Sequence, residues 1–219
     1  HNPEFSMLEW YRIGWDHLRL LDETVELVRA ALALVGRNAG LRITTFRDLY
    51  WQALQLDPLT ADIETLRNAL GDVGIDPIGL TRDDWLDVLM THRLQPAFAS
   101  DQLLAVHDWP ASQAALARIR NDVLPVAERF ELYLGSLELA NGYHELCDPS
   151  EQRARFERDA AVRAQRGLPS IPNDTALLAA LAHGLPACAG VAVGVDRLLM
   201  ALLGTSRIAD VLAFEFAKA

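Results

Sequence analysis

The sequence has few cysteines and no excess of basic residues. Its two cysteines, Cys147 and Cys188, lie far apart and lack CxxC spacing. Two free thiols in a cytosolic protein are the simplest explanation, which argues against a disulfide framework. Lys and Arg number 20 against 30 Asp and Glu, giving a formal net charge of −10. This acidic balance argues against a surface that grips nucleic acid non-specifically.

Long uninterrupted apolar runs are also missing, although 51% of the residues are hydrophobic. Charged residues such as Arg29 and the pair Asp196–Arg197 break the longest runs, so we expect no transmembrane helix and no signal peptide. The chain also lacks an initiator methionine and opens directly on HNPEFSMLEWYR. This opening looks like a strand already in progress, and we expect the sequence to be part of a longer chain.

Alternation of side chains predicts a strand over residues 1–12. Apolar residues fall on both of its faces, which predicts a central strand with a buried Glu9 that needs a partner. Apolar residues recur at helical spacing over residues 16–35, so a helix is expected there, followed by a short strand over 41–45.

Three short helices are expected next, each beginning after a threonine that can act as an N-cap. They cover residues 46–56, 60–73 and 81–92, with Thr45, Thr60 and Thr81 as caps. We interpret residues of about 45–98 as a helical insertion between strands of one sheet, within a single domain that spans residues 1–219.

The second half of the chain mixes strands and helices. Strands are expected over 103–108 and 126–139, a charged surface helix over 149–166 with Phe156 and Val162 as its anchors, and a helix over 175–183 capped by Asp174. His107–Asp108 invites a catalytic interpretation, but no nucleophile lies at a recognisable spacing. A turn at the end of a strand is therefore the preferred interpretation.

The segment ELANGYHE carries two carboxylates and an amide. Asn141–Gly142 predicts a turn or a bulge, which would let Glu138 and Glu145 face one site. Carboxylates and an amide suit a hard cation or an ammonium group. The alternative interpretation is a charged turn on the surface.

The segment CAGVAVGVDRLLM, residues 188–200, predicts a buried strand that runs directly into a buried helix. Gly190 and Gly194 leave room for close approach to the backbone. Arg197 lies near the helix N-terminus, where an anion is favoured. The local hypothesis is a nucleotide-phosphate site, but on this stretch alone the preferred interpretation is a core strand and helix whose arginine forms a structural ion pair.

Three of these segments together resemble class II aminoacyl-tRNA synthetases of the lysyl type. HNPEFSMLEWYR resembles the second half of motif 2, ELANGYHEL the segment that holds magnesium–ATP and the lysine side chain, and GVAVGVDRLLM motif 3. The resemblance implies an α+β fold, a class II synthetase-like antiparallel sheet flanked by helices. Motif 1 and the first strand of motif 2, with its Arg and Glu, are missing from the sequence.

Within this family the chain is most similar to the lysyl-tRNA-synthetase paralogues that modify elongation factor P. Ala192 is the most informative position, because lysyl-tRNA synthetases usually have Gly there, and one methyl group can favour (R)-β-lysine over α-lysine by ~1–3 kcal/mol. The resemblance implies a cytoplasmic enzyme that activates (R)-β-lysine or lysine with ATP and Mg²⁺ as an aminoacyl-adenylate, and transfers it to a lysine of elongation factor P. It also implies a homodimer when complete, with no membrane association and no stable binding of tRNA. The alternatives are a lysyl-tRNA synthetase catalytic core and a truncated, non-catalytic relative.

The resemblance also implies roles for individual residues. Arg197 and Glu138 are the expected catalytic residues. The residues expected at ATP are His1, Asn2, Phe5, Glu138, Leu139, Gly194 and Arg197. The residues expected at the amino-acid substrate are Glu9, Tyr11, Asn141, Glu145 and Ala192. The expected metal ligands are Glu138 and Glu145.

Overall fold

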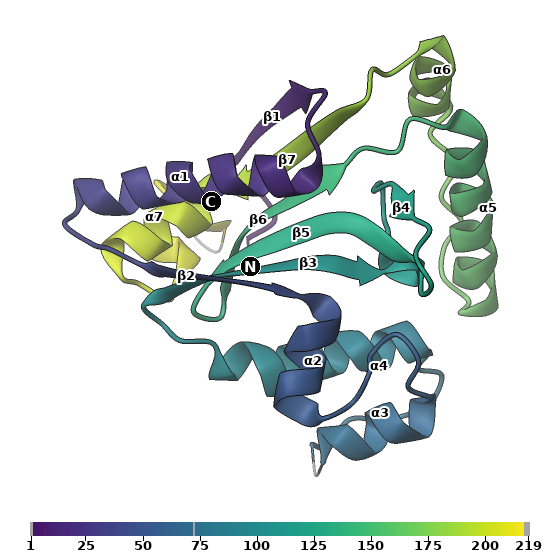
Figure 1. Cartoon of the computed structure of the whole chain (residues 1–219), viewed down its shortest axis with the longest axis horizontal. Coiled ribbons are helices and arrows are strands. Elements are labelled where there is room, and N and C mark those ends of the chain that lie inside the picture. Colours follow the sequence, from purple (N-terminus) through teal and green to yellow (C-terminus); the bar gives the residue numbers. More distant parts are fainter. Residues whose placement is uncertain (1, 72, 217–219) are drawn as a thin grey trace.

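The computed structural model describes residues 2–71 and 73–216 and is built around one seven-stranded sheet (Figure 1). The strands are β1 (Met7–Ile13), β2 (Gly40–Thr45), β3 (Gln102–Pro110), β4 (Ile119–Arg120), β5 (Val126–Leu134), β6 (Leu137–His144) and β7 (Cys188–Gly194). Their order is β1-β7-β6-β5-β3-β2, with β4 paired to β5. Among the strands of the described residues, β2 and β3 are the one parallel pair. The predicted α+β fold with an antiparallel sheet and flanking helices is confirmed.

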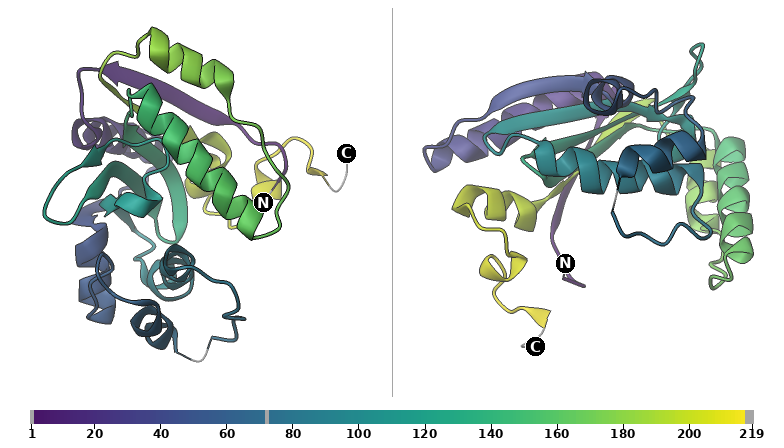
Figure 2. Two further views of the ribbon diagram at one scale, coloured as in Figure 1. Left: turned by 90° about the vertical axis from the view of Figure 1, so that its right-hand side faces the viewer. Right: turned by 90° about the horizontal axis from the view of Figure 1, so that it is seen from below.

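Helices cover the sheet on both faces and at its ends (Figures 1 and 2). They are α1 (His17–Leu34), α2 (Phe46–Leu54), α3 (Ile63–Leu70), α4 (Arg82–Leu89), α5 (Pro149–Gln165), α6 (Thr175–His183) and α7 (Val195–Leu203). One core packs α1 against β5, β6 and β7, and a second packs α2 to α4 against the opposite face of β3 and β5. None of the helices within the described residues combines the length and hydropathy needed to cross a membrane.

The first helix follows its sequence pattern closely. Asp16 caps α1 by accepting the N–H of Arg19 at 2.8 Å. The residues buried along α1 recur every three or four positions, as a one-sided helix requires; they include Leu21, Val25, Val28 and Leu32. This face lies on the sheet and forms the centre of the α1 core.

The helices between β2 and β3 begin mostly where caps were predicted. Thr45 accepts the N–H of Asp48, and Thr81 forms a reciprocal capping box with Asp84. The predicted cap at Thr60 is wrong, because Asp62 caps α3 and accepts the N–H of Thr65 at 2.8 Å. The N–H of Thr60 instead donates to the carbonyl of Asp57 within the preceding turn.

The expectation that the first strand is central is wrong. Within the described residues β1 lies at the edge of the sheet and pairs only with β7. Its apolar side chains are largely exposed, including Met7 (43%) and Tyr11 (61%). Glu9 is exposed as well and needs no buried partner. On the other face of β1, the Trp10 indole donates to Glu23 of α1 at 2.8 Å, which holds the strand to the helix.

The predicted strand over 126–139 and the turn at Asn141–Gly142 are also wrong. The chain reverses at Gly135, which has φ +55°, and Asn141–Gly142 lies inside β6, paired on both sides. Gly142 is required for packing, because a Cβ atom there would overlap the ring of Phe130. A turn signal has been overridden here by sheet pairing.

Two smaller expectations also change. The anchors of α5 are Gln152 and Arg155, while Val162 is exposed. The Arg155 guanidinium donates to two backbone carbonyls of the segment before β4, each at 2.8 Å. The strand that carries His107 does not end at a turn, because β3 continues to Pro110 after a register shift, where Asp108 has φ +57°.

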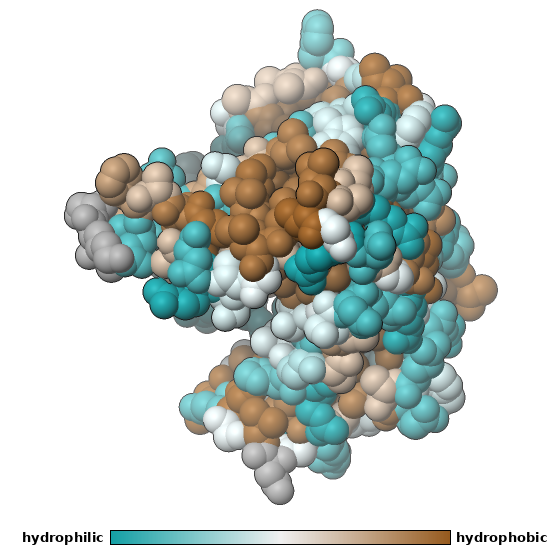
Figure 3. All heavy atoms as spheres, turned by 90° about the vertical axis from the view of Figure 1, so that its left-hand side faces the viewer, coloured by the Kyte–Doolittle hydropathy of each residue, from teal (hydrophilic) through white to brown (hydrophobic). Residues whose placement is uncertain are grey.

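Apolar side chains gather on the face where the C-terminal end of α1 and the helix α7 lie (Figure 3). The large exposed apolar residues of these two helices include Leu34, Leu199 and Leu203, with Leu18 at the other end of α1. This surface therefore remains apolar in the isolated chain.

Candidate active site

The predicted join of strand and helix is present, since β7 ends at Gly194 and α7 begins at Val195. The segment before β1 is fastened to this join by two hydrogen bonds. The backbone N–H of Ser6 donates to Asp196 Oδ2 at 2.7 Å, and the N–H of Val195 donates to the Ser6 carbonyl at 3.0 Å. Asp196 is 7% exposed. The segment before β1 and the join between β7 and α7 thus lie side by side and form one surface.

A pocket of about 270 Å³ opens at this surface. Its lining includes the residues expected at ATP that the structure describes: Asn2, Phe5, Glu138, Leu139, Gly194 and Arg197. The remaining one, His1, lies outside the described residues. Phe5 is 61% exposed, so its ring is free to stack on a planar group. Sequence reasoning did not assign Ser6, Met7, Asp196 and Ile208, which also line this pocket.

Arg197 is held in place by Glu138. The guanidinium Nη1 donates to the Glu138 carbonyl at 2.9 Å and lies 3.3 Å from the Glu138 carboxylate. The side chains of Arg197 and Glu138 are 38% and 33% exposed. The arginine thus forms the ion pair that the sequence offered as one alternative, and both partners line the pocket, while its role at a phosphate stays a prediction. The other donors of the planar guanidinium remain available for an anion.

A β-bulge places Glu138 on the pocket side of the sheet. Leu132 pairs with Ala140, whereas Tyr133 pairs with Glu138, so Leu139 is an extra residue in β6. An extra residue reverses which face the following side chains occupy. Glu138 and Asn141 therefore share one face despite their odd separation. The sequence predicted a turn or bulge here, and the bulge lies two residues before the expected position.

A second pocket of about 220 Å³ adjoins the first along the same face. Its lining includes all five residues expected at the amino-acid substrate: Glu9, Tyr11, Asn141, Glu145 and Ala192. Asn141 and Ala192 line both pockets. Ala192 pairs with Glu9 of β1 on one side and with Asn141 of β6 on the other. The position singled out from the sequence thus lies at the junction of the two pockets.

Glu145 is the most perturbed carboxylate of the second pocket. Burial raises its pKa to about 7. The Tyr11 hydroxyl faces the same region, and burial followed by the charge of Glu145 raises its pKa. A half-buried carboxylate beside a tyrosine hydroxyl is suited to receive a primary ammonium group, which would supply the missing positive charge.

Gly190 makes room for these two side chains. A Cβ atom at Gly190 would overlap the Glu145 carboxylate and lie 2.5 Å from the Tyr11 ring. Sequence reasoning noted only that Gly190 leaves space, and it missed Tyr143, whose hydroxyl accepts a hydrogen bond from the Asn141 amide at 3.0 Å. Gly194 is different, since a Cβ atom there would make ordinary contacts with Arg197 at 3.5 Å.

The predicted pair of metal ligands is divided between the pockets. Glu138 lines the first and Glu145 the second. Among the described residues, the clusters with metal-ligand spacing contain neither of them. The charge of Glu138 acts on another acidic residue, Glu131, whose carboxylate accepts hydrogen bonds from Arg129 and Tyr133. The pairing of Glu138 with Glu145 on one cation stays a prediction.

Comparison with known proteins agrees with this geometry. Residues 1–218 match the family described as tRNA synthetases class II (D, K and N). Proteins named elongation factor P–(R)-β-lysine ligase are similar over the whole chain, at 44% identity in Pectobacterium carotovorum and Enterobacter sp. strain 638 and 45% in Yersinia enterocolitica. The chain covers 67% of the length of each. This family uses ATP. The chain therefore belongs to the class II tRNA synthetases of the D, K and N group.

Proposed function

We propose that this chain activates (R)-β-lysine with ATP and transfers the resulting aminoacyl group to a lysine of elongation factor P. The observation that carries the proposal is the pair of adjoining pockets that share Asn141 and Ala192. One pocket offers an exposed aromatic ring and an arginine, as a nucleotide requires. The other offers the half-buried carboxylate of Glu145, as the side-chain ammonium of a lysine requires. The relatives at 44–45% identity carry the name of this activity.

In the nucleotide pocket, Phe5 stacks on the adenine and Asn2 contacts ATP. Gly194 lets the nucleotide approach the backbone, and Arg197 binds its terminal phosphate. Glu138 is the proposed ligand for Mg²⁺, which supplies positive charge to the phosphates when bound. The carboxylate of Glu138 already lies in this pocket, whereas we assign Glu145 to the substrate rather than to the metal.

In the second pocket, Glu145 and Tyr11 bind the side-chain ammonium of the amino acid, with Glu9 and Asn141 beside them. The substrate carboxylate then lies at the junction of the two pockets, near Ala192 and next to the nucleotide. It attacks the α-phosphorus, a new P–O bond forms, and pyrophosphate leaves. This step requires positioning and electrostatic stabilisation and no nucleophile from the protein. The lysine amine of the acceptor then attacks the acyl carbon, and AMP leaves.

The choice of acceptor distinguishes this proposal from a lysyl-tRNA synthetase core. The net charge of −10 is unfavourable for stable binding of tRNA. Ala192 adds a methyl group at the junction of the pockets, where it can select the position of the amino group. We place the reaction in the cytoplasm and propose a homodimer, for which the apolar face of α1 and α7 is the candidate surface.

The test measures ATP–pyrophosphate exchange on the intact protein with α-lysine and with (R)-β-lysine. Transfer of each labelled amino acid to elongation factor P and to lysine tRNA is measured in parallel. We expect faster exchange with (R)-β-lysine and labelling of elongation factor P alone. Labelling of tRNA alone would show a lysyl-tRNA synthetase instead. Absence of exchange with both amino acids would show a non-catalytic relative.

A further inference from the structure

A group of histidines and carboxylates lies on the face of the sheet opposite the two pockets. His144 of β6 and Glu128 of β5 are cross-strand neighbours, one residue beyond the pair Arg129–Tyr143. Side chains alternate between the faces of a strand. Because Tyr143 lines the substrate pocket, Glu128 and His144 point to the other face, which α1 covers. His17, the first residue of α1, meets them there.

Among the described residues the buried His17 Nδ1 has no partner, whereas His144 Nδ1 and Glu128 Oε2 form an ion pair with each other. His17 is 2% exposed and Glu128 is 8% exposed. A ring nitrogen of His17, one of His144 and an oxygen of Glu128 all lie within 4.8 Å of one another. The His144 nitrogen is 2.7 Å from the Glu128 oxygen. Buried polar atoms normally have partners, so the unpaired His17 Nδ1 calls for one, and a cation shared with the adjoining His144 and Glu128 would provide it.

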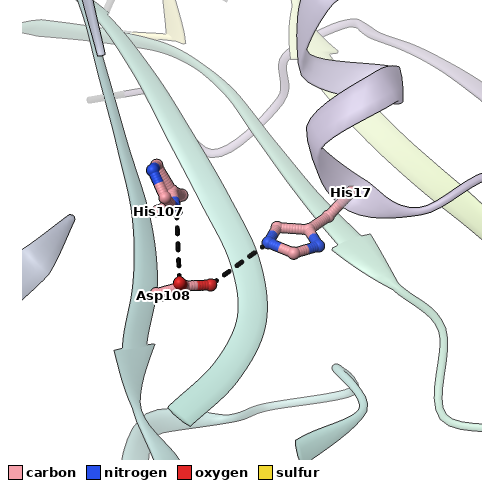
Figure 4. A group of neighbouring side chains, drawn as sticks. All are labelled: His17, His107 and Asp108. Carbon is pink, nitrogen blue, oxygen red and sulfur yellow. Dashed lines mark hydrogen bonds and ion pairs between the residues drawn. The ribbon is translucent and has the colours of Figure 1, made fainter. Parts of the chain in front are cut away.

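The neighbouring residues fix the orientation of the His17 ring. Its Nε2 lies 3.3 Å from Asp108 Oδ1 on β3, as Figure 4 shows, with His107 on the other side of the same carboxylate. Arg120 donates to both oxygens of Asp108, at 3.2 and 2.8 Å, which keeps the carboxylate ionised. An ionised carboxylate can only accept, so Nε2 carries the proton and donates. The Nδ1 of His17 is the ring atom that has no partner among the described residues.

This arrangement matches a known way of preparing a metal ligand. A histidine that ligates a metal usually donates its second ring N–H to a carboxylate, which fixes the tautomer and the ring orientation. Two imidazole nitrogens and a carboxylate oxygen suit Zn²⁺ and related divalent transition metals, whereas Mg²⁺ prefers an all-oxygen site. The Glu128 carboxylate also lies 3.6 Å from Arg118 and 3.8 Å from Arg120.

We propose that His17, Glu128 and His144 bind one divalent transition metal of the Zn²⁺ type, with Asp108 as the positioning residue for His17. The metal connects the beginning of α1 to the hairpin of β5 and β6. These elements lie far apart in the sequence, so binding stabilises the packing of the helix on the sheet. The site is separate from the ATP-dependent chemistry, because the sheet lies between the two.

The experiment uses the intact protein, purified without a histidine tag and dialysed against a chelator, and measures binding of Zn²⁺ by calorimetry. Wild type is compared with Glu128→Gln, His17→Gln, Asp108→Asn and a control, His92→Ala, which changes an exposed histidine. We expect one Zn²⁺ per chain, at least tenfold weaker binding in the two ligand variants, and a 10- to 100-fold loss in Asp108→Asn. His92→Ala should bind as wild type does.

Thermal unfolding with and without Zn²⁺ gives a second measurement. Saturating Zn²⁺ should raise the Tm of wild type and His92→Ala by about 5 °C or more, with no such rise in Glu128→Gln. Co²⁺ spectra are recorded on the wild type alone, so this measurement does not depend on whether the variants fold. A spectrum of nitrogen and oxygen ligation is expected. A thiolate charge-transfer band, wild-type affinity in Glu128→Gln, or no binding of Zn²⁺ to wild type would overturn the proposal.

Discussion

The backbone N–H of Ser6 donates to the buried carboxylate of Asp196 at 2.7 Å, across 190 residues of sequence. This bond fixes the segment that carries Phe5 against the helix that carries Arg197. Because the two side chains line one pocket, the bond decides their relative position.

Asp196→Ala should therefore weaken nucleotide binding without changing the nucleotide contacts themselves. Loss of the acceptor leaves a part-buried N–H unsatisfied, which costs about 1–3 kcal/mol. We expect the KM for ATP in the exchange reaction to rise about tenfold, with a smaller change for lysine. Asp196→Asn retains an acceptor oxygen and should recover most of the affinity. Equal behaviour of the two variants would show that the hydrogen bond does not matter.

Gly190→Ala should abolish binding of the amino acid while ATP still binds. Its methyl group would displace Glu145 and Tyr11, and inserted atoms in a packed region cost about 1–3 kcal/mol or more. Gly194→Ala is the matched control, since its methyl group makes only ordinary contacts within the protein. That variant should fold normally and lose affinity for ATP alone. Calorimetric titration with each ligand separates the two effects, and the same loss in both variants would contradict the division into two pockets.

The affinity for lysine should depend on pH through Glu145. Burial raises the pKa of this carboxyl to about 7 in the free protein, so it is mostly neutral at pH 6 and mostly ionised at pH 8. An ammonium group binds the ionised form, and the dissociation constant should fall about tenfold between these pH values. Glu145→Gln should bind weakly at both. An affinity that is flat with pH in the wild type would argue against Glu145 as the ammonium receptor.

The same carboxyl should reduce stability at neutral pH. Its pKa of about 7 in the folded protein lies above the ordinary value of 4.5, so the folded state holds a proton that the unfolded state releases. Stability therefore falls as the pH rises from about 4.5 to 7. Glu145→Gln removes this penalty and should stabilise the protein by about 2–3 kcal/mol at pH 8. Urea unfolding should show little gain at pH 4; a gain that does not change with pH would have another cause.

Ala192→Gly should shift the preference toward α-lysine. Ala192 lies at the junction of the pockets, opposite Glu9 and Asn141, where a methyl group limits where the substrate amino group can lie. A methyl group in a pocket changes selectivity by about 1–3 kcal/mol, or roughly 10- to 200-fold in kcat/KM. Exchange kinetics with both amino acids measure this ratio. An unchanged ratio would mean that other residues determine the choice.

Local signals in the sequence predicted the helices well, since α1 has a one-sided apolar pattern and Thr81 caps α4 through a bond to a residue three positions away. The resemblance to a family brought together many, though not all, of the residues that line the two pockets. The failures concern long-range packing. Asn141–Gly142 resembles a turn, but pairing with two strands determines its conformation.

The cluster of His17 and its neighbours could not be predicted either. Its members lie on α1, β3, β5 and β6, with no spacing that a short motif could reveal. The interpretation of His107–Asp108 as a simple turn missed the bulge that points Asp108 at His17. Only the folded sheet brings these side chains together.

The extra residue at Leu139 has a consequence for engineering. The two halves of β6 are out of phase, so Glu138 and Asn141 occupy one side although simple counting puts them on opposite sides. A graft of the segment ELANG into a regular strand of another scaffold would turn one of these residues away from the ligand. A single-residue deletion at Leu139 would do the same in this protein. Transplanting the site therefore requires transplanting the irregularity of its backbone as well as its side chains.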